Sequence, residues 1–370
     1  MSSIALSTLD LVIIAGFMLL TLIVGIRSGR GMKSIRDYAV AGQSYGTPIL
    51  LMTLTATLIG GGSTTGTVAE FYEVGIVFLV AMLGDGLSCI VAARFIAPKF
   101  DSRFDGMISA GDIIRKYYGR AVERFSALVV CISSLGVISA QLIALGHIMQ
   151  SMLGVPFNYA VCIMGAIMIA YSTFGGIKAV TMTDVLQFAI LVVTIPILAQ
   201  VALSNAGDFS TIFQKVGEMD SSKMQIFGSP YLTEYCFLFI LYAMPELRPH
   251  VVQRFLMFKN KKHIVKTLYG YSFMAYVLLF MCICIAFSAM LLLDDVEPKA
   301  IIPTFISMYL PVGIKGLVIA GMIAAIMSTA DSYLNTASIL FAHNLLPHNF
   351  DSMKWAKVAT VLVGTFALFV

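Results

Sequence analysis

One apolar stretch with a polar face, Gly313 to Leu346, most limits what this chain can fold into. It is long enough to cross a bilayer as a helix, for which about 20 apolar residues suffice. Its centre nevertheless carries a carboxylate and several hydroxyls, and at helical spacing one face holds Ala325, Ser328, Asp331, Ser332 and Asn335. Lipid offers these groups no hydrogen bonds, so the face has to point into a bundle of helices.

Oxygen atoms on a stiff helix suit a small, hard cation. In the alternative interpretation, each hydroxyl bonds to a carbonyl one turn earlier and Asp331 meets another helix. That alternative is the usual one for a single Ser or Thr, but the whole cluster favours a cation.

The composition is that of a polytopic helical membrane protein. Of the 370 residues, 59% are hydrophobic and 12% are charged, against about a quarter charged in soluble domains. Apolar runs predict ten spans, at 9–27, 46–69, 75–98, 124–152, 157–174, 179–204, 232–257, 265–293, 313–346 and 355–370. The first run has no small-residue cleavage site after it, so we expect a retained span. The last run has no polar tail, so we expect a truncated sequence.

Charges in the loops predict the orientation. Lys and Arg cluster after the first, third, seventh and ninth runs, whereas Asp and Glu dominate the alternate loops. Because cytoplasmic loops carry the excess of basic residues, this alternation puts the N-terminus outside. We expect an integral protein of a bacterial inner (cell) membrane, with the lipid bilayer as one partner and no nucleic acid.

The second run contains Gly60-Gly61-Gly62 among Ser and Thr residues. Three glycines favour a helix break after about Ile59, which would leave the last carbonyls of the first half without partners. Those carbonyls lie at the negative end of the helix dipole and attract a cation. Close packing of helices against small residues is the alternative, and both interpretations stay open at this point.

Two further spans carry charged residues inside the expected bilayer. Asp184 lies about one turn into the sixth run, where it can cap the helix or reach an ion. The seventh run is interrupted between Pro245 and Pro249, which frees backbone groups. Glu246 and Arg248 can form an ion pair within that interruption.

These residues resemble the sodium:solute symporter family, and the resemblance covers nearly the whole chain. Four motifs carry it by their order and spacing, with P-H-x-x-Q-R (Pro249 to Arg254) as a weaker fifth. They are S-x-x-D-Y-x-x-A-G (Ser34 to Gly42), T-A-T-L-I-G-G-G-S (Thr55 to Ser63), G-G-I-K-A-V-x-x-T-D-x-x-Q (Gly175 to Gln187) and A-A-I-M-S-T-A-D-S (Ala324 to Ser332).

The resemblance implies an all-α polytopic membrane protein with five-plus-five inverted repeats and one extra N-terminal helix. All of it would form a single transmembrane transporter domain, residues 1–370. The extra helix would be 9–27, the first repeat 45–204 and an incomplete second repeat 232–370. The first helix of each repeat is expected to be broken or bent.

The resemblance also implies the sites. The principal sodium site would use backbone and hydroxyl oxygens of Ala56, Ile59, Ala325, Ser328 and Thr329. A second sodium or a proton would be held by Asp184, Asp331 and Ser332, next to Ser328. The solute would lie at the midplane against the helix breaks, and position and polarity favour Gly61, Ser63, Gln141, Tyr242 and Glu246.

The implied function is a sodium-coupled secondary active symporter that imports a small organic solute by alternating access. The alternatives are a membrane sensor module of a symporter-like signalling protein and an inactive truncated symporter. We do not expect an enzyme, because the five histidines are scattered and no HExxH or paired-acid spacing occurs. The single tryptophan, Trp355, lies at a membrane edge, so an aromatic cage for a quaternary amine would need Tyr or Phe.

Overall fold

The computed structural model describes residues 6–43, 45–100, 104–245, 247–258, 260–294, 296–347 and 352–369, and this part of the chain contains helices and no strands. The helices are α1 (Thr8–Ser28), α2 (Ile35–Val40), α3 (Thr47–Leu58), α4 (Thr67–Val74), α5 (Phe78–Val91), α6 (Ala110–Leu153), α7 (Phe157–Ala206), α8 (Phe209–Met219), α9 (Leu232–Ala243), α10 (Pro249–Leu256), α11 (Lys261–Leu292), α12 (Ile301–Tyr309), α13 (Ile314–Ile339) and α14 (Ser352–Ala367). Each of the ten predicted spans coincides with one or two of these helices.

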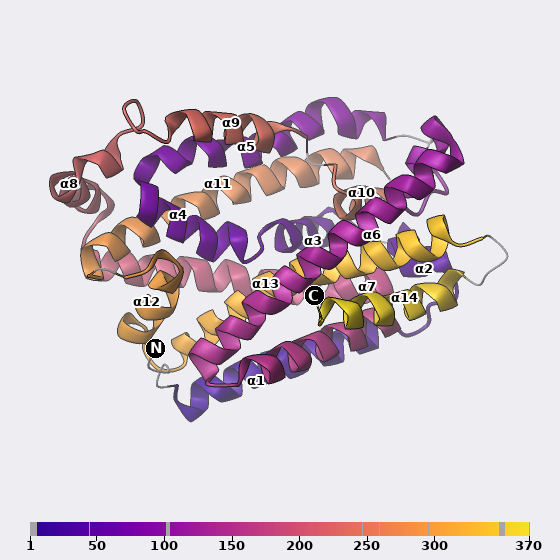
Figure 1. The fold of residues 1–370 in the computed structure, drawn as a ribbon, viewed down its shortest axis with the longest axis horizontal. Helices are drawn as coiled ribbons and strands as arrows, with labels where there is room; N and C mark the ends of the chain where they lie inside the picture. Colours follow the sequence, from indigo (N-terminus) through magenta and orange to yellow (C-terminus); the bar gives the residue numbers. More distant parts are fainter. Residues whose placement is uncertain are drawn as a thin grey trace.

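Helix α13 is the centre of the bundle (Figure 1). It packs against α1, α6, α7 and α14, and its polar face is buried. In the described part of the chain, six helical stretches are long and apolar enough to cross a membrane. The stretch that contains α13 is the most buried of them. The prediction that the polar face of 313–346 points into the protein is confirmed.

Two of the expected spans are broken in the middle. Helix α3 ends at Leu58, and the chain becomes helical again only in a π-helical turn, Gly62–Gly66, that leads into α4. Helix α9 ends at Ala243, and α10 begins at Pro249. Both predicted interruptions are therefore confirmed. The broken halves leave backbone groups without helical partners deep in the bundle.

A third irregularity divides α7 into two helical segments. Gly176 lies between the predicted fifth and sixth spans with φ of 46°, a left-handed conformation that favours glycine. An added Cβ would lie 2.7 Å from the backbone oxygen of Tyr38. The Tyr38 hydroxyl in turn donates to the Ser172 carbonyl at 3.1 Å. The Ser34–Gly42 motif therefore packs against the middle of α7.

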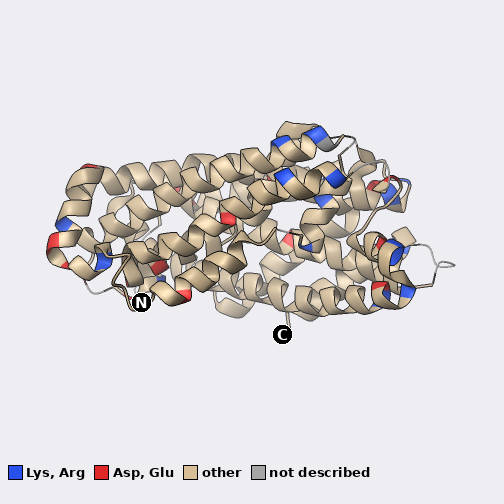
Figure 2. Cartoon of the chain, turned by 90° about the horizontal axis from the view of Figure 1, so that it is seen from above, with Lys and Arg blue, Asp and Glu red and all other residues tan. Residues whose placement is uncertain are grey.

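Lys and Arg residues gather toward one end of the bundle, whereas the opposite end carries mainly acidic residues (Figure 2). This is the charge distribution that the loop pattern predicts for a helical membrane protein.

The extra N-terminal helix is fixed to the start of α13 by one carboxylate. Asp10 is fully buried and accepts hydrogen bonds from the backbone amides of Gly313, at 2.7 Å, and Gly316, at 2.8 Å. These amides belong to the first turn of α13, where backbone donors have no helical partner and negative charge is favoured. Ser7 also donates to Asp10 through its amide and its hydroxyl.

Replacing this carboxylate should loosen the attachment of α1. Asp10→Ala should lower the free energy of unfolding by about 2–3 kcal/mol, because it leaves buried amides without a charged acceptor. Thermal unfolding of the purified protein in detergent measures the change. Asp294→Ala, which removes an exposed carboxylate, is the control and should unfold like the wild type. Equal midpoints for both variants would contradict this account of α1.

Candidate cation and solute sites

The break in α3 lies against the polar face of α13. The Ser328 hydroxyl donates to the carbonyl of Ala56 and lies 3.3 Å from the carbonyl of Ala325. The Thr329 hydroxyl donates to the carbonyl of Thr57 at 3.2 Å and lies 3.4 Å from the Ala325 carbonyl. The structure therefore brings together four of the five residues predicted for the sodium site.

The fifth residue, Ile59, immediately follows the last helical residue of α3. Its φ of −94° and ψ of 75° end the helix. The next residue, Gly60, touches α13, because an added Cβ would lie 2.5 Å from the Thr329 hydroxyl oxygen and 3.8 Å from the Ala325 carbonyl oxygen. The chain between Ala56 and Gly60 thus runs along the oxygen-bearing face of α13, as both interpretations of the glycine triplet require.

These oxygens are neutral, and they are drawn from two helices. Ser328 and Ala56 are fully buried, so few water molecules compete for them. Each hydroxyl has one proton, which lies between a carbonyl of α13 and a carbonyl of α3. If the hydroxyl turns, the same carbonyl and hydroxyl oxygens can all point lone pairs at one cation. Neutral oxygens are sufficient for a monovalent ion, because only a single charge has to be stabilised.

Hydroxyls after the break satisfy the carbonyls that the break frees. Ser63 donates to the carbonyls of Leu58, at 3.1 Å, and Gly60, at 3.2 Å. Thr65 donates to the carbonyl of Gly61 at 2.8 Å. The Ser and Thr residues around the glycine triplet therefore stabilise a non-helical backbone that lipid could not satisfy.

Two of the three residues predicted for a second ion, Asp184 and Ser332, meet around a side chain that was given no role in the prediction. Arg254 of α10 is 2% exposed. Its Nη2 donates to Asp184 Oδ2 at 2.9 Å and to Ser332 Oγ at 2.7 Å, and it also contacts the hydroxyl of Thr57. Its Nε donates to the hydroxyl of Thr53 at 3.2 Å. Asp184 therefore pairs across helices and does not cap its own.

Asp331, the third predicted residue, has a different partner. The hydroxyl of Tyr171 donates to Asp331 Oδ2, and both residues are fully buried. The other carboxylate oxygens of Asp184 and Asp331, and the side-chain amides of Gln187 and Asn335, have no hydrogen-bond partner among the described residues. Buried polar atoms are usually satisfied, so this cluster has capacity for water or an ion.

The predicted solute residues do not share one cavity. Gly61 and Gln141 line a cleft of about 810 Å³ that reaches Glu297 in the loop before α12. Ser63 and Tyr242 line another cleft, of about 540 Å³, between α4, α5 and α9. Gly61 and Ser63 line different clefts because residues two positions apart on a helical turn point to nearly opposite sides. The five solute residues stay a prediction.

Both clefts nevertheless border the same segment, since Gly62 of the triplet and Gly66 at the end of the π-helical turn line each of them. The second cleft is the more acidic, with Glu70, Asp85 and Glu234 in its lining. Glu246, the remaining predicted solute residue, lies outside the described residues.

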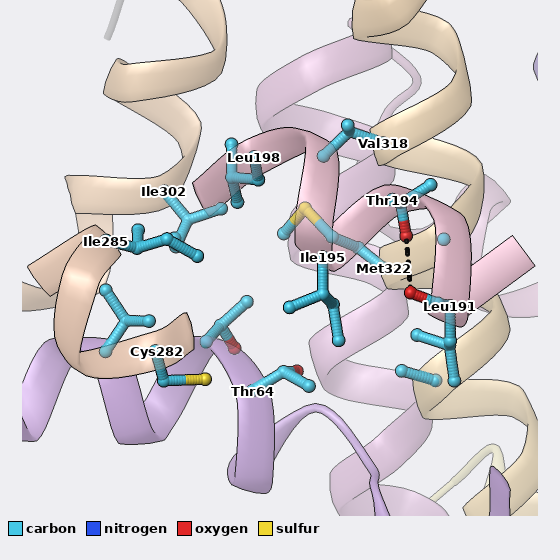
Figure 3. A pocket seen from close by; sticks show the side chains of 14 residues that line it. Thr64, Leu191, Thr194, Ile195, Leu198, Cys282, Ile285, Ile302, Val318 and Met322 are labelled. Atoms are coloured by element: carbon cyan, nitrogen blue, oxygen red, sulfur yellow. Dashed lines mark hydrogen bonds between the residues drawn. The ribbon is translucent and has the colours of Figure 1, made fainter. Parts of the chain in front are cut away.

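Figure 3 shows a small apolar cavity of about 40 Å³, and Ala325 is one of the residues that line it. Its lining includes Leu191, Ile195, Leu198, Ile285, Val318 and Ala325. The threonine hydroxyls in the lining already donate to backbone carbonyls, as Thr194 does to Leu191 at 3.4 Å. Water in this cavity would find few hydrogen-bond partners. Ala325 therefore borders an apolar cavity as well as contributing a carbonyl oxygen to the candidate cation site.

Sequence reasoning missed Arg254, Tyr171, Thr53 and Thr57. The signal for the two threonines was present, because residues four apart share a helix face. Arg254 was counted as part of the cytoplasmic end of the seventh span, and its position before a lysine cluster hid its inward direction.

Comparison with known proteins identifies this arrangement. The family model described as the sodium:solute symporter family matches residues 38–366. The chain belongs to the sodium:solute symporter family. Among curated members, the high-affinity choline transporter 1 of Caenorhabditis elegans is 25% identical, over 97% of this chain and 68% of its own length. The sodium/glucose cotransporter of Vibrio parahaemolyticus is 23% identical, over 92% of this chain and 69% of its own length.

A solved symporter structure has the same fold. The substrate-bound, outward-open structure of a Na⁺-coupled sialic acid symporter has a TM-score of 0.86 at 21% identity, covering 98% of this chain and 81% of that one. This likeness confirms the fold class predicted for the chain, an all-α five-plus-five inverted-repeat transporter fold with one extra N-terminal helix. The chain spans about two thirds of the length of the two curated relatives.

The contact between Gly60 and Thr329 allows a test of whether Gly60 borders the candidate sodium site. Gly60→Ala should weaken sodium binding at least tenfold, which is about 1.4 kcal/mol. The new methyl group forces either α3 away from α13 or the Thr329 hydroxyl out of the site. Calorimetry with sodium chloride on the purified protein measures the affinity.

Gly62→Ala is the matched control for this measurement. It makes the same change in the same triplet, but an added Cβ there meets no atom within 4 Å. Sodium affinity should stay near the wild-type value in this variant. If both variants bind sodium equally well, Gly60 does not border the ion.

Proposed function

We propose that this protein is a sodium-coupled secondary active symporter that imports a small organic solute by alternating access. The observation that carries the proposal is the contact of the broken end of α3 with Ser328 and Thr329 of α13. Membership of the sodium:solute symporter family supports sodium as the coupling ion. The ion is cargo here, and no resident cofactor is needed.

The proposed sodium site consists of the carbonyl oxygens of Ala56, Ile59 and Ala325 and the hydroxyl oxygens of Ser328 and Thr329. An ion at this position replaces the hydrogen bonds that now join the hydroxyls to carbonyls of α3. It therefore holds α3 against α13 more strongly than those bonds do. This is differential stabilisation of one conformation, which a ligand needs in order to shift a conformational equilibrium.

The glycine triplet connects the ion to the solute. The triplet follows the proposed sodium ligands of α3 directly, and two of its glycines, Gly61 and Gly62, line the clefts in which the solute would bind. Ordering this backbone by the ion would complete the solute site, and the coupling is reciprocal, so the solute would tighten sodium binding by the same factor. Gly61, Ser63, Gln141 and Tyr242 remain the proposed solute contacts.

Relatives support a small organic solute without fixing its class, since they are named for choline and for glucose. The proposed orientation in the cell membrane puts the N-terminus outside, with the basic end of the bundle toward the cytoplasm (Figure 2). The larger cleft then opens to the outer side, because it reaches Glu297 in a loop on the acidic side of the membrane.

The ion gradient is large enough for the proposed work. One monovalent cation that moves down 100 mV supplies about 2.3 kcal/mol. A tenfold concentration gradient adds about 1.4 kcal/mol. Together these terms sustain roughly a few-hundred-fold solute accumulation for each sodium ion.

Uptake measurements test the proposal. Vesicles with the reconstituted protein are screened for sodium-dependent uptake of amino acids, sugars, carboxylates and amines. Ser328→Ala should raise the sodium concentration for half-maximal uptake at least tenfold, because it removes one ion ligand. Cys162→Ala, at an exposed position on α7, should not change it. An unchanged sodium requirement in Ser328→Ala would refute the assignment of this site.

A further inference from the structure

The side chain of Arg254 occupies the position where a second cation was expected. Its guanidinium lies among oxygen atoms of three helices: Thr53 and Thr57 of α3, Asp184 of α7 and Ser332 of α13. Asp184 and Arg254 form a buried ion pair at 2.9 Å. One carboxylate and three hydroxyls are the kind of oxygen set that a hard cation takes in proteins.

The chain holds this guanidinium in place through α10. Arg254 Nη1 donates to the carbonyl of His250 at 3.1 Å. The neighbouring Gln253 donates to the carbonyl of Ala39 at 2.7 Å and accepts from the hydroxyl of Thr336 at 2.8 Å. Helix α10 is thereby fixed to both α2 and α13, which holds the base of the Arg254 side chain in place.

We propose that Arg254 acts as a built-in second cation, which takes the place of a second transported ion. This inference rests on the proposed function, because it concerns how many sodium ions the proposed symporter carries. The protein then binds one sodium ion, at Ser328 and the α3 break. The two predicted cation sites are both used, one by a mobile ion and one by a tethered guanidinium.

The charges around the site support this assignment. Two carboxylates, Asp184 and Asp331, are fully buried near each other, and each retains one oxygen without a partner among the described residues. Burying carboxylates is costly unless cations pair with them. Arg254 supplies one positive charge at Asp184, and its removal would leave oxygens that a sodium ion could bind.

The competing explanation is that Arg254 only joins helices. Buried arginines often do this, and such a pair contributes to a fixed structure without marking an ion site. The two explanations differ in one measurable quantity, the number of sodium ions bound per chain. A purely structural arginine leaves no ion site behind when it is replaced.

Equilibrium binding of radioactive sodium to the purified protein in nanodiscs measures this number. The wild type should bind one sodium ion per chain. Ser328→Ala should bind that ion with at least a tenfold lower affinity. Arg254→Gln should bind two, because the amide keeps the polar contacts without the charge. Arg124→Gln, which removes an exposed guanidinium on α6, is the control and should bind one.

Several results would overturn the proposal. Two sodium ions on the wild type would mean that Arg254 does not replace an ion. This test needs no arginine variant, so it holds even if Arg254→Gln fails to fold. A folded Arg254→Gln variant, checked by its thermal unfolding, that binds no more sodium than the wild type would also refute it.

Failure of the proposed function looks different. If the wild type binds no sodium, the symport proposal falls. In that case one sodium on Arg254→Gln still supports the built-in cation, and none refutes it.

Discussion

Every polar group on α13 has to find its partner inside the protein, because lipid offers none. This constraint decides what surrounds the helix. Ser328 and Thr329 meet carbonyls at the broken end of α3, Ser332 meets Arg254, and Asp331 meets Tyr171. The helices that carry these partners, α3, α7 and α10, pack around α13 (Figure 1). The need to satisfy the buried polar face of α13 thus decides which helices surround it.

The same requirement explains why the break in α3 is tolerated. An interrupted helix exposes carbonyls that cost free energy in an apolar interior. Here hydroxyls on both sides satisfy them, Ser63 from the π-helical turn and Ser328 from α13. Hydroxyls are suited to this purpose because they rotate. A hydroxyl can donate to a carbonyl, or it can turn so that its oxygen and the carbonyl oxygen coordinate the same cation. The bonds that stabilise the protein without an ion are therefore those that an ion at the proposed sodium site would replace.

The sequence predicted the depth of a residue in the membrane better than the direction in which its side chain points from the helix. The break after Ile59 and the inward face with Ala325 and Ser328 followed from glycine content and helical spacing, and both are present. The solute residues were chosen by position and polarity, without a direction around the helix, and Gly61 and Ser63 line different clefts. Arg254 was missed because the gap between α9 and α10 resets the helical phase, so spacing from α9 gives no direction for α10. Its partner Asp184 lies 70 positions earlier in the chain, a separation over which sequence patterns give no register.

Thr57 shows how the two cation positions would influence each other. Its carbonyl accepts from Thr329 in the proposed sodium site, and its hydroxyl contacts Arg254 and lies 3.0 Å from Ser332 Oγ. Ser332 also donates to the carbonyl of Ser328 at 2.8 Å, so the positions are joined through α13 as well as through α3. An ion that turns the Thr329 hydroxyl away from Thr57 changes a residue on which the guanidinium depends. Because Arg254 belongs to α10, an ion at the proposed sodium site would reach the broken α9–α10 span through these direct contacts.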